Sequence, residues 1–250
     1  MHTTRMNTID AMSAIRTECT GEMRKLKAII FDVDGTLADT EVNGHLVACN
    51  EAFAQMGFDI RWSWEEFKEL LKIPGNARRM RLALSARTSL SEAEIDRIVP
   101  ELFALKKECY LKLVEKLPLL PGVARIIHEA IERGVRLAIV SVTDEDQIVA
   151  LLKAQIPEAL NAFDPILGKQ SGEKNAALYA QCAAMLGCAT SEVLVLEDSE
   201  KGAKAAKGAG LSCAVVYNDY TKGQDFTGAE LVVKSLEHLN LDLLERLCLG

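Results

Sequence analysis

Short apolar runs separated by helix-like segments recur along this chain. The clearest runs, continuously apolar over about four residues as expected for strands buried on both faces of a parallel sheet, lie at 28–31, 137–140, 193–196 and 213–216. Weaker strand candidates cover 164–167 and 230–233. Helices are predicted between the strands, at about 123–132, 145–155, 174–186, 200–207 and 235–247. This alternation predicts an α/β fold with a doubly wound parallel sheet.

A helical pattern replaces the strand pattern between residues 41 and 116. Apolar residues recur there at helical spacing, at Leu46, Cys49, Phe53 and Met56, at Phe67, Leu70 and Leu71, and at Ile95, Ile98, Val99, Leu102, Leu105 and Cys109. Turn residues at Gly57, Pro74-Gly75 and Ser89–Ser91 separate these segments. We therefore expect an all-helical domain at 41–116, inserted into an α/β core of residues 25–40 and 117–250, with an N-terminal tail at 1–24.

The composition narrows the classes of partner. Of the 250 residues, 49% are hydrophobic and 26% are charged, which is typical of a globular protein. A net charge of -7 argues against nucleic acid and against an anionic membrane surface as partners. Neither a membrane-length apolar run nor a secretory leader is evident, so we expect a cytoplasmic protein. The seven scattered cysteines lack a Cys-x-x-Cys pair, and this predicts a reducing compartment without structural disulfides or zinc.

Asp32 and Asp34 follow the first apolar run directly. Two carboxylates at the end of a buried strand require a partner for their charge, and a metal ion together with a phosphate would provide it. Strand alternation points both side chains the same way, although a turn starting at Gly35 can re-aim the second one. The simpler interpretation is that Asp34-Gly35 is only a tight turn and Asp32 a cap at the end of the strand.

Polar residues also follow two other predicted strands. Ser141 and Thr143 come after 137–140, and Glu197-Asp198 comes after 193–196. Because parallel strands deliver their carboxyl ends to one crevice, we expect these side chains to meet Asp32. Packing alone does not explain adjacent acids at a buried strand end. Thr143 has an alternative role as the N-cap of the next helix, and Ser199 and Glu200 are suited to capping as well.

The Asp-x-Asp-Gly-Thr pattern at residues 32–36, behind its hydrophobic strand, resembles motif I of the haloacid dehalogenase-like (HAD) phosphohydrolase superfamily. The resemblance implies a Rossmann-like HAD core in which Asp32 is a nucleophile that forms an aspartyl-phosphate and Asp34 is the general acid/base. It makes Ser141 the phosphoryl-holding residue of motif II, which Thr143 would assist.

The acidic run at Glu197-Asp198 resembles motif IV of the same superfamily. The resemblance implies a bound Mg²⁺ whose ligands are the Asp32 carboxylate, the Asp34 backbone carbonyl and Asp198, with Glu197 as a second, water-mediated acidic contact. Motif III requires a lysine, and here the chain departs from the Gly-Lys-Pro of many relatives. We favour Lys174 for this role over Lys169, from its spacing to the following Leu178-Tyr179.

The helical block is similar to the small cap of the CbbY/phosphoglucomutase-like branch of this superfamily. By that similarity, substrate-binding candidates in the cap are Glu41, His45, Arg78 and Arg81. The position of His45 relative to Thr40 is shifted from that in the mutases, and the arginines could equally form a solvated helix face. Guanidinium groups suit the second phosphate of a bisphosphate. For Trp62 and Trp64 we expect a packing role.

These patterns together predict a Mg²⁺-dependent phosphatase that acts on a small phosphorylated metabolite, a sugar phosphate or bisphosphate. A hexose-phosphate mutase that uses the same phosphoenzyme is the first alternative, and a non-catalytic binding protein on the same scaffold is the second. A dehalogenase needs the nucleophile but no metal, so Asp34 and Glu197-Asp198 argue against it. The oligomeric state stays open, and a monomer is compatible with the sequence.

Overall fold

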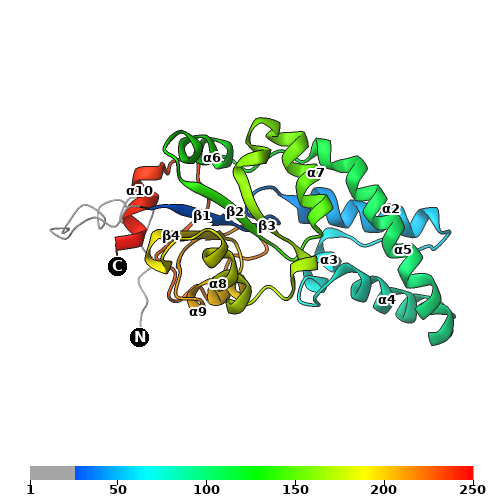
Figure 1. The fold of residues 1–250 in the computed structure, drawn as a ribbon. Coiled ribbons are helices and arrows are strands. Elements are labelled where there is room, and N and C mark those ends of the chain that lie inside the picture. Colours follow the sequence, from blue (N-terminus) through cyan, green and yellow to red (C-terminus); the bar gives the residue numbers. More distant parts are fainter. Residues whose placement is uncertain (1–25, 250) are drawn as a thin grey trace.

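Six parallel strands form the centre of the protein in the computed structural model, which describes residues 26–249 (Figure 1). The predicted tail at 1–24 lies outside the described residues. The strands occur in the order β3-β2-β1-β4-β5-β6. Their bounds are β1 Ala28–Phe31, β2 Arg136–Val140, β3 Phe163–Leu167, β4 Val193–Glu197, β5 Ser212–Val216 and β6 Leu231–Val233. All six predicted strands are thus confirmed, including the two weaker candidates.

The sheet register brings the strand ends together. Phe31 at the end of β1 pairs with Ile139 of β2 on one side and with Leu196 of β4 on the other. The chain runs outward from β1 to β3 and then returns to place β4 beside β1. This reversal makes the carboxyl edge of β1 and β4 the point at which an open parallel sheet binds its ligands.

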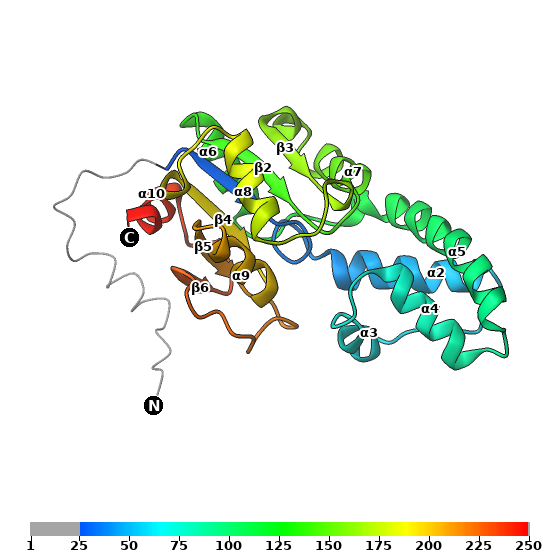
Figure 2. The ribbon, with the colours of Figure 1, turned by 60° about the horizontal axis from the view of Figure 1, so that its bottom comes forward.

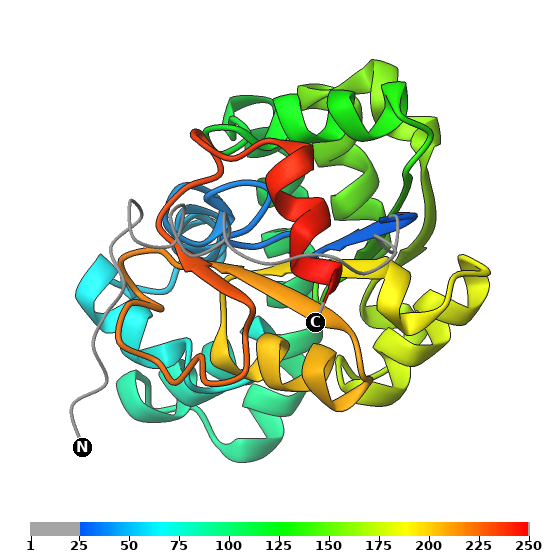
Figure 3. The same ribbon diagram turned by 90° about the vertical axis from the view of Figure 1, so that its left-hand side faces the viewer.

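Helices cover both faces of the sheet (Figure 3). The helices α6 Val123–Glu132, α7 Glu145–Gln155 and α10 Leu241–Glu245 contribute to one large apolar cluster with the residues of one sheet face. On the other face, α8 Ala176–Met185 and α9 Glu200–Gly208 form a second cluster. The central strands β1 and β4 are buried along their whole length and read as uninterrupted apolar runs, whereas the edge strands β3 and β6 each have an exposed residue, and this is why they were the weaker candidates.

Two helices begin later than expected because asparagine side chains cap them. The segment predicted as a helix at 235–247 is helical only from Leu241, where Asn240 accepts a hydrogen bond from the backbone N of Leu243 at 3.0 Å, and it ends in a 3-10 turn at Arg246–Leu249. In α8, Asn175 caps through the backbone N of Ala177 at 2.9 Å. Lys174 therefore lies in a loop rather than in the helix.

A helical unit stands at the carboxyl edge of the sheet (Figures 1 and 2). It consists of a π-helical turn, η1 Glu41–Leu46, followed by α2 Val47–Gln55, α3 Trp64–Leu70, α4 Asn76–Arg87, α5 Glu92–Leu113 and the 3-10 turn η2 Val114–Lys116. The unit has an apolar core of its own, in which Trp62 is 3% exposed and packs against Phe53 and Phe67. The packing role expected for Trp62 is confirmed.

The six cysteines of the described chain are free thiols. Among residues 26–249, no helix has both the length and the apolar character needed to span a membrane.

Candidate active site

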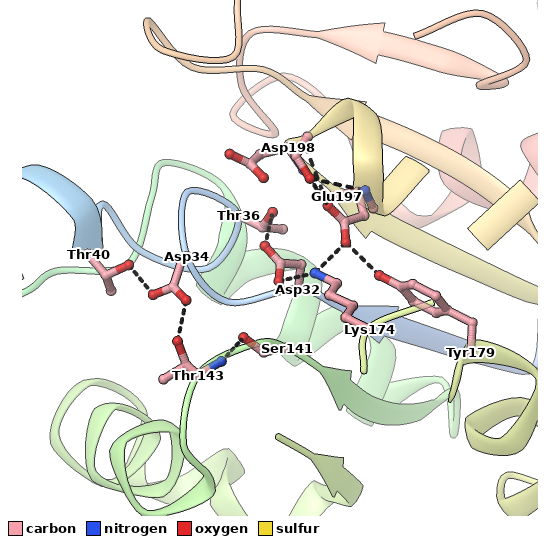
Figure 4. A network of polar contacts seen from close by, with 12 residues as sticks. Asp32, Asp34, Thr36, Thr40, Ser141, Thr143, Lys174, Tyr179, Glu197 and Asp198 are labelled. Atoms are coloured by element: carbon pink, nitrogen blue, oxygen red, sulfur yellow. Dashed lines mark hydrogen bonds and ion pairs between the residues drawn. The ribbon is translucent and has the colours of Figure 1, made fainter. Parts of the chain in front are cut away.

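Asp32 lies at the carboxyl end of β1, buried to 3% exposure, where the ends of β2 and β4 meet it (Figure 4). Lys174 Nζ contacts its Oδ1, and Thr36 Oγ1 donates to its Oδ2 at 3.2 Å. The local cause is the sequence itself, because the apolar run of β1 ends at Phe31 and the next residue emerges at the edge of the sheet. Asp32 is thus a buried carboxylate held at a strand end by one ammonium group and one hydroxyl group.

Lys174 links two carboxylates. Its Nζ contacts Asp32 and lies 2.5 Å from Glu197 Oε1, with the side chain 8% exposed. Burial works to lower the pKa of Lys174, but the two carboxylates outweigh burial and raise this pKa above its ordinary value, so the ammonium stays charged. Lys169, the competing candidate, lies over the ring of Phe103 at 4.9 Å instead. The structure therefore brings the favoured lysine to Asp32.

Glu197 has its carboxylate bound by protein donors. Tyr179 donates a hydrogen bond to Oε1 at 2.5 Å, and Oε2 accepts hydrogen bonds from Asp198 N and Ser199 Oγ, each at 3.2 Å. A β-carbon at Gly202 would lie 2.1 Å from this carboxylate, so the first turn of α9 can approach it only with glycine there. Glu197 therefore holds Lys174 through its Nζ and Asp198 through its backbone N.

Asp32, Glu197 and Asp198 form a buried acidic cluster. Each offers an oxygen, and these oxygens lie within 4.8 Å of one another. Burial, together with the charges of Asp32 and Glu197, raises the pKa of Asp198. Burial also raises the pKa of Asp32, against the opposing effect of Lys174. One lysine does not balance three buried carboxylates, and a hard divalent cation with oxygen ligands fits this donor set.

Asp34 turns away from Asp32. The chain bends at Gly35, whose φ of 82° suits glycine. The Asp34 carboxylate accepts hydrogen bonds from Thr40 Oγ1 and Thr143 Oγ1 (Figure 4). His45 Nε2 lies 3.3 Å from its Oδ1. The strand alternation that would aim both aspartates at one atom does not extend past Phe31, so that expectation is wrong for the side chain of Asp34.

The partners of Asp34 keep it ionised. Burial works to raise its pKa, but His45 and the hydroxyls of Thr143 and Thr40 outweigh burial and hold this pKa well below its usual value. Thr143 does not cap α7, because the N-cap is Asp144 and no side chain caps that helix. The capping alternative for Thr143 is therefore wrong. Ser141 is fully buried, and its Oγ accepts from the backbone N of Thr143 at 3.1 Å.

His45 connects Asp34 to a lysine that sequence reasoning missed. Its Nδ1 lies 2.8 Å from Lys106 Nζ, and its ring stacks on Tyr110 with centroids 4.5 Å apart. Because an ammonium only donates, Nδ1 is the acceptor and the proton on Nε2 faces Asp34. Burial and Lys106 lower the pKa of His45, against the opposing effect of Asp34. Lys106 interrupts the apolar stripe of α5, and a lysine at such a position is the sequence feature that could have indicated its burial.

The π-helical turn explains why the shifted histidine still reaches Asp34. Thr40 and His45 both contact Asp34 and are five residues apart. On an α-helix, residues five apart point about 140° away from each other. The wider π turn at Glu41–Leu46 reduces this angle to about 50°, so both side chains share one face.

Deleting Asn43 tests this account. Removal of the exposed Asn43 places the histidine four residues after Thr40 instead of five. If the turn then closes as an α-helix, the two side chains point within about 40° of each other and the histidine still reaches Asp34. We expect activity within about threefold of wild type and unchanged thermal unfolding. Deletion of the exposed Glu51 in α2 is the control, because it rotates buried Phe53 out of register and should prevent folding. Equal damage from the two deletions would contradict the account.

The predicted arginines lie away from the strand ends. Arg78 is exposed, and Arg81 forms ion pairs of 2.7 Å with Glu92 and Asp96 near the start of α5. Asp96 precedes Lys106 by ten residues, about 15 Å along the helix. The structure therefore engages Arg81 with acids of α5 and leaves Arg78 exposed on the surface of α4, as the solvated alternative expects.

Arg79, rather than Arg78 or Arg81, is the buried arginine of α4, and the predicted Glu41 is the candidate of the cap whose carboxyl is buried. Arg79 is 7% exposed, and its Nε donates to the backbone O of Ile73 at 2.8 Å. Glu41 Oε2 is buried without a hydrogen-bond partner. Burial and the charge of Asp34 raise the pKa of Glu41 to about 8, against Arg79 and Lys106. The spacing of apolar residues in the sequence did not indicate that Arg79 is buried and Arg78 exposed.

A parallel α/β sheet with acids, a serine and a lysine at its strand ends is the arrangement of a phosphoryl-transfer enzyme. The family model described as haloacid dehalogenase-like hydrolase matches residues 29–216, and the chain belongs to this family. It is a HAD-type phosphoric monoester hydrolase of the CbbY-like branch.

Known relatives cover most of the chain. Protein CbbY of Rhodobacter capsulatus is 36% identical over 218 residues, which are 85% of this chain and 94% of that protein. The structure of CbbY from Rhodobacter sphaeroides in complex with phosphate has a TM-score of 0.75 at 35% identity and covers 88% of this chain and 99% of that one. A variant of the same protein was solved with xylulose 1,5-bisphosphate. β-Phosphoglucomutase of Bacillus subtilis is 27% identical over 88% of this chain and 94% of its own length.

Proposed function

We propose that this protein is a Mg²⁺-dependent phosphatase that hydrolyses a phosphorylated sugar through an aspartyl-phosphate on Asp32. The observation that carries the proposal is the contact of Lys174 with Asp32 beside Asp198 at the carboxyl edge of β1 and β4. A phosphoryl group placed there meets one oxygen nucleophile, one permanent positive charge and a site for a cation. The relative crystallised with xylulose 1,5-bisphosphate makes a sugar bisphosphate the first substrate to test.

The residues divide the reaction into two steps. An oxygen of Asp32 attacks phosphorus, and the bond from phosphorus to the sugar oxygen breaks as Lys174 and Ser141 hold the phosphoryl oxygens. Water then attacks the aspartyl-phosphate and releases inorganic phosphate and free Asp32. When bound, Mg²⁺ would neutralise the phosphoryl charge, and the Asp32 and Asp198 carboxylates and the Asp34 carbonyl would hold it.

Asp34 serves as the acid and then as the base. In the observed arrangement Asp34 is ionised and its low pKa makes it a weak base, so it must take up a proton from solvent before it can act as the acid of the first step. To protonate the leaving alkoxide, the carboxyl must be released from Thr40 and Thr143 and turn toward the substrate. These hydroxyls thus set how readily Asp34 takes up the proton that it donates.

Phosphate release across a substrate panel tests the function. We expect turnover of xylulose 1,5-bisphosphate or a related sugar bisphosphate in preference to nucleotide and glycerol phosphates. EDTA should reduce the rate at least about 100-fold, and added Mg²⁺ should restore it. An EDTA-treated enzyme that keeps its full rate would remove the metal from the proposal, and a panel without any turnover would contradict the substrate class.

A hexose-phosphate mutase is the second candidate, because the chain is 27% identical to β-phosphoglucomutase. The two activities differ in whether the aspartyl-phosphate passes to water or to a second sugar hydroxyl. With β-glucose 1-phosphate and a bisphosphate primer, a phosphatase releases inorganic phosphate. Accumulation of glucose 6-phosphate in that assay would establish the mutase instead.

A further inference from the structure

Tyr220 places a hydroxyl in the site that the proposed reaction does not use. The residue lies in the loop between β5 and β6, and its hydroxyl is buried without a hydrogen-bond partner. Buried polar atoms in folded proteins are almost always paired, so an unpaired one at a ligand site needs an explanation. Sequence analysis gave no signal for this tyrosine.

The hydroxyl lies over the turn that follows the nucleophile. A β-carbon added at Gly35 would be 2.4 Å from Tyr220 OH, 2.5 Å from Asp198 Oδ2 and 2.6 Å from Asn218 Nδ2. The three atoms therefore surround one point above Gly35. Tyr220 consequently stands beside the acidic cluster and next to the turn that carries Asp34.

Asn218 holds the loop in this position. Its Oδ1 accepts from the backbone N of Tyr220 at 3.1 Å and of Thr221 at 3.0 Å, and its Nδ2 donates to Asp198 Oδ2 at 2.7 Å. The loop is thus fastened to a predicted metal ligand. The same side chain therefore also holds the backbone of the tyrosine.

The ring of Tyr220, which belongs to the α/β core, also contacts the helical unit. Trp64, the first residue of α3, packs edge-on against it with ring centroids 5.6 Å apart. The packing role expected for Trp64 is confirmed, and its partner Tyr220 belongs to the α/β core rather than to the helical unit. A phenol seated between the core and the cap beside the nucleophile is placed to touch a substrate that both parts enclose.

We propose that Tyr220 binds the substrate, its hydroxyl donating a hydrogen bond to a sugar oxygen while Trp64 seats the ring. This inference rests on the proposed function. A phenol is protonated at neutral pH, so its hydroxyl is available as a hydrogen-bond donor. Glu41 Oε2, also unpaired, offers the substrate hydroxyls a second polar atom.

Tyr220→Phe tests the proposal, because it removes the hydroxyl and keeps the ring on Trp64. For the best sugar phosphate of the panel, kcat/KM should fall about 10-fold, mainly through KM. For p-nitrophenyl phosphate, which has no sugar hydroxyls, it should stay within about twofold. Tyr217→Phe in the same loop is the matched control and should change neither substrate, since Tyr217 packs against the apolar cluster under α8 and α9.

Replacing the tryptophan gives a second measurement. Trp64→Ala removes the contact that seats the ring and should raise KM for the sugar phosphate in the same direction, again with p-nitrophenyl phosphate unaffected. A Tyr220→Phe enzyme with wild-type KM for the sugar phosphate would overturn the proposal. A wild-type enzyme that hydrolyses neither compound would instead overturn the proposed function.

Discussion

Asp32→Asn should abolish phosphate release and leave the protein folded. The amide has the shape of the carboxylate but is not a competent nucleophile, so we expect kcat to fall at least about 10⁴-fold. Thermal unfolding at pH 7 should stay equal to wild type or rise. Burial raises the pKa of Asp32 despite the charge of Lys174, so its ionised form costs stability at neutral pH, and in the variant Lys174 keeps Glu197 as its partner.

Asp34→Asn is the matched control for the stability effect. Its pKa is lowered in the folded protein, so the ionised carboxylate contributes stability above its unfolded pKa and loses it as pH falls through the folded value. At pH 7 this variant should therefore unfold at a lower temperature than wild type. Residual turnover of the Asp32→Asn enzyme at more than about one per cent of wild type would contradict the role of the nucleophile.

Lys174→Met should damage both folding and activity. The change removes the ammonium that faces two buried carboxylates, and a broken buried ion pair costs about 3–5 kcal/mol of unfolding free energy. Urea unfolding in EDTA measures this cost. The loss should shrink toward about pH 5, because burial raises the pKa of Asp32 and this carboxylate, without its ammonium partner, takes up a proton as pH falls. Phosphate release should fall below detection.

Lys169→Met is the control that separates the two lysines. It removes only the contact with Phe103, for which we expect a cost of about 0.5–1 kcal/mol. Its turnover should remain near wild type. A reversed result, with Lys169→Met inactive and Lys174→Met active, would exclude Lys174 as the residue that stabilises the transferring phosphoryl group.

Local patterns predicted the strands and therefore the place of the site. A strand buried on both faces leaves an apolar run, and the first polar residue after it must emerge at the sheet edge, as Asp32 does. The helices of the cap were visible in the same way, through apolar spacing. The sequence pattern placed the starts of α10 and α8 too early, before the capping residues Asn240 and Asn175. An asparagine that caps a helix is not distinguished by the apolar pattern from one inside it.

The residues that sequence patterns ranked wrongly are the charged ones. Arg79 and Arg81 are two residues apart on α4, yet Arg79 is buried in the cap and Arg81 pairs with acids at its surface. Lys106 was overlooked because a single lysine on an apolar stripe is read as an interruption. Whether a charged side chain is buried depends on partners that are distant in sequence.

The sequence by itself determined the parallel core, the helical insertion and the presence of acids at two adjacent strand ends, because these follow from periodicity and from strand direction. Only the tertiary structure decided that Asp34 faces Thr40, Thr143 and His45, that Lys174 rather than Lys169 meets Asp32, and that Tyr220 lies over Gly35. Loops and a π turn place those side chains, and neither has a repeat that a sequence pattern can reveal.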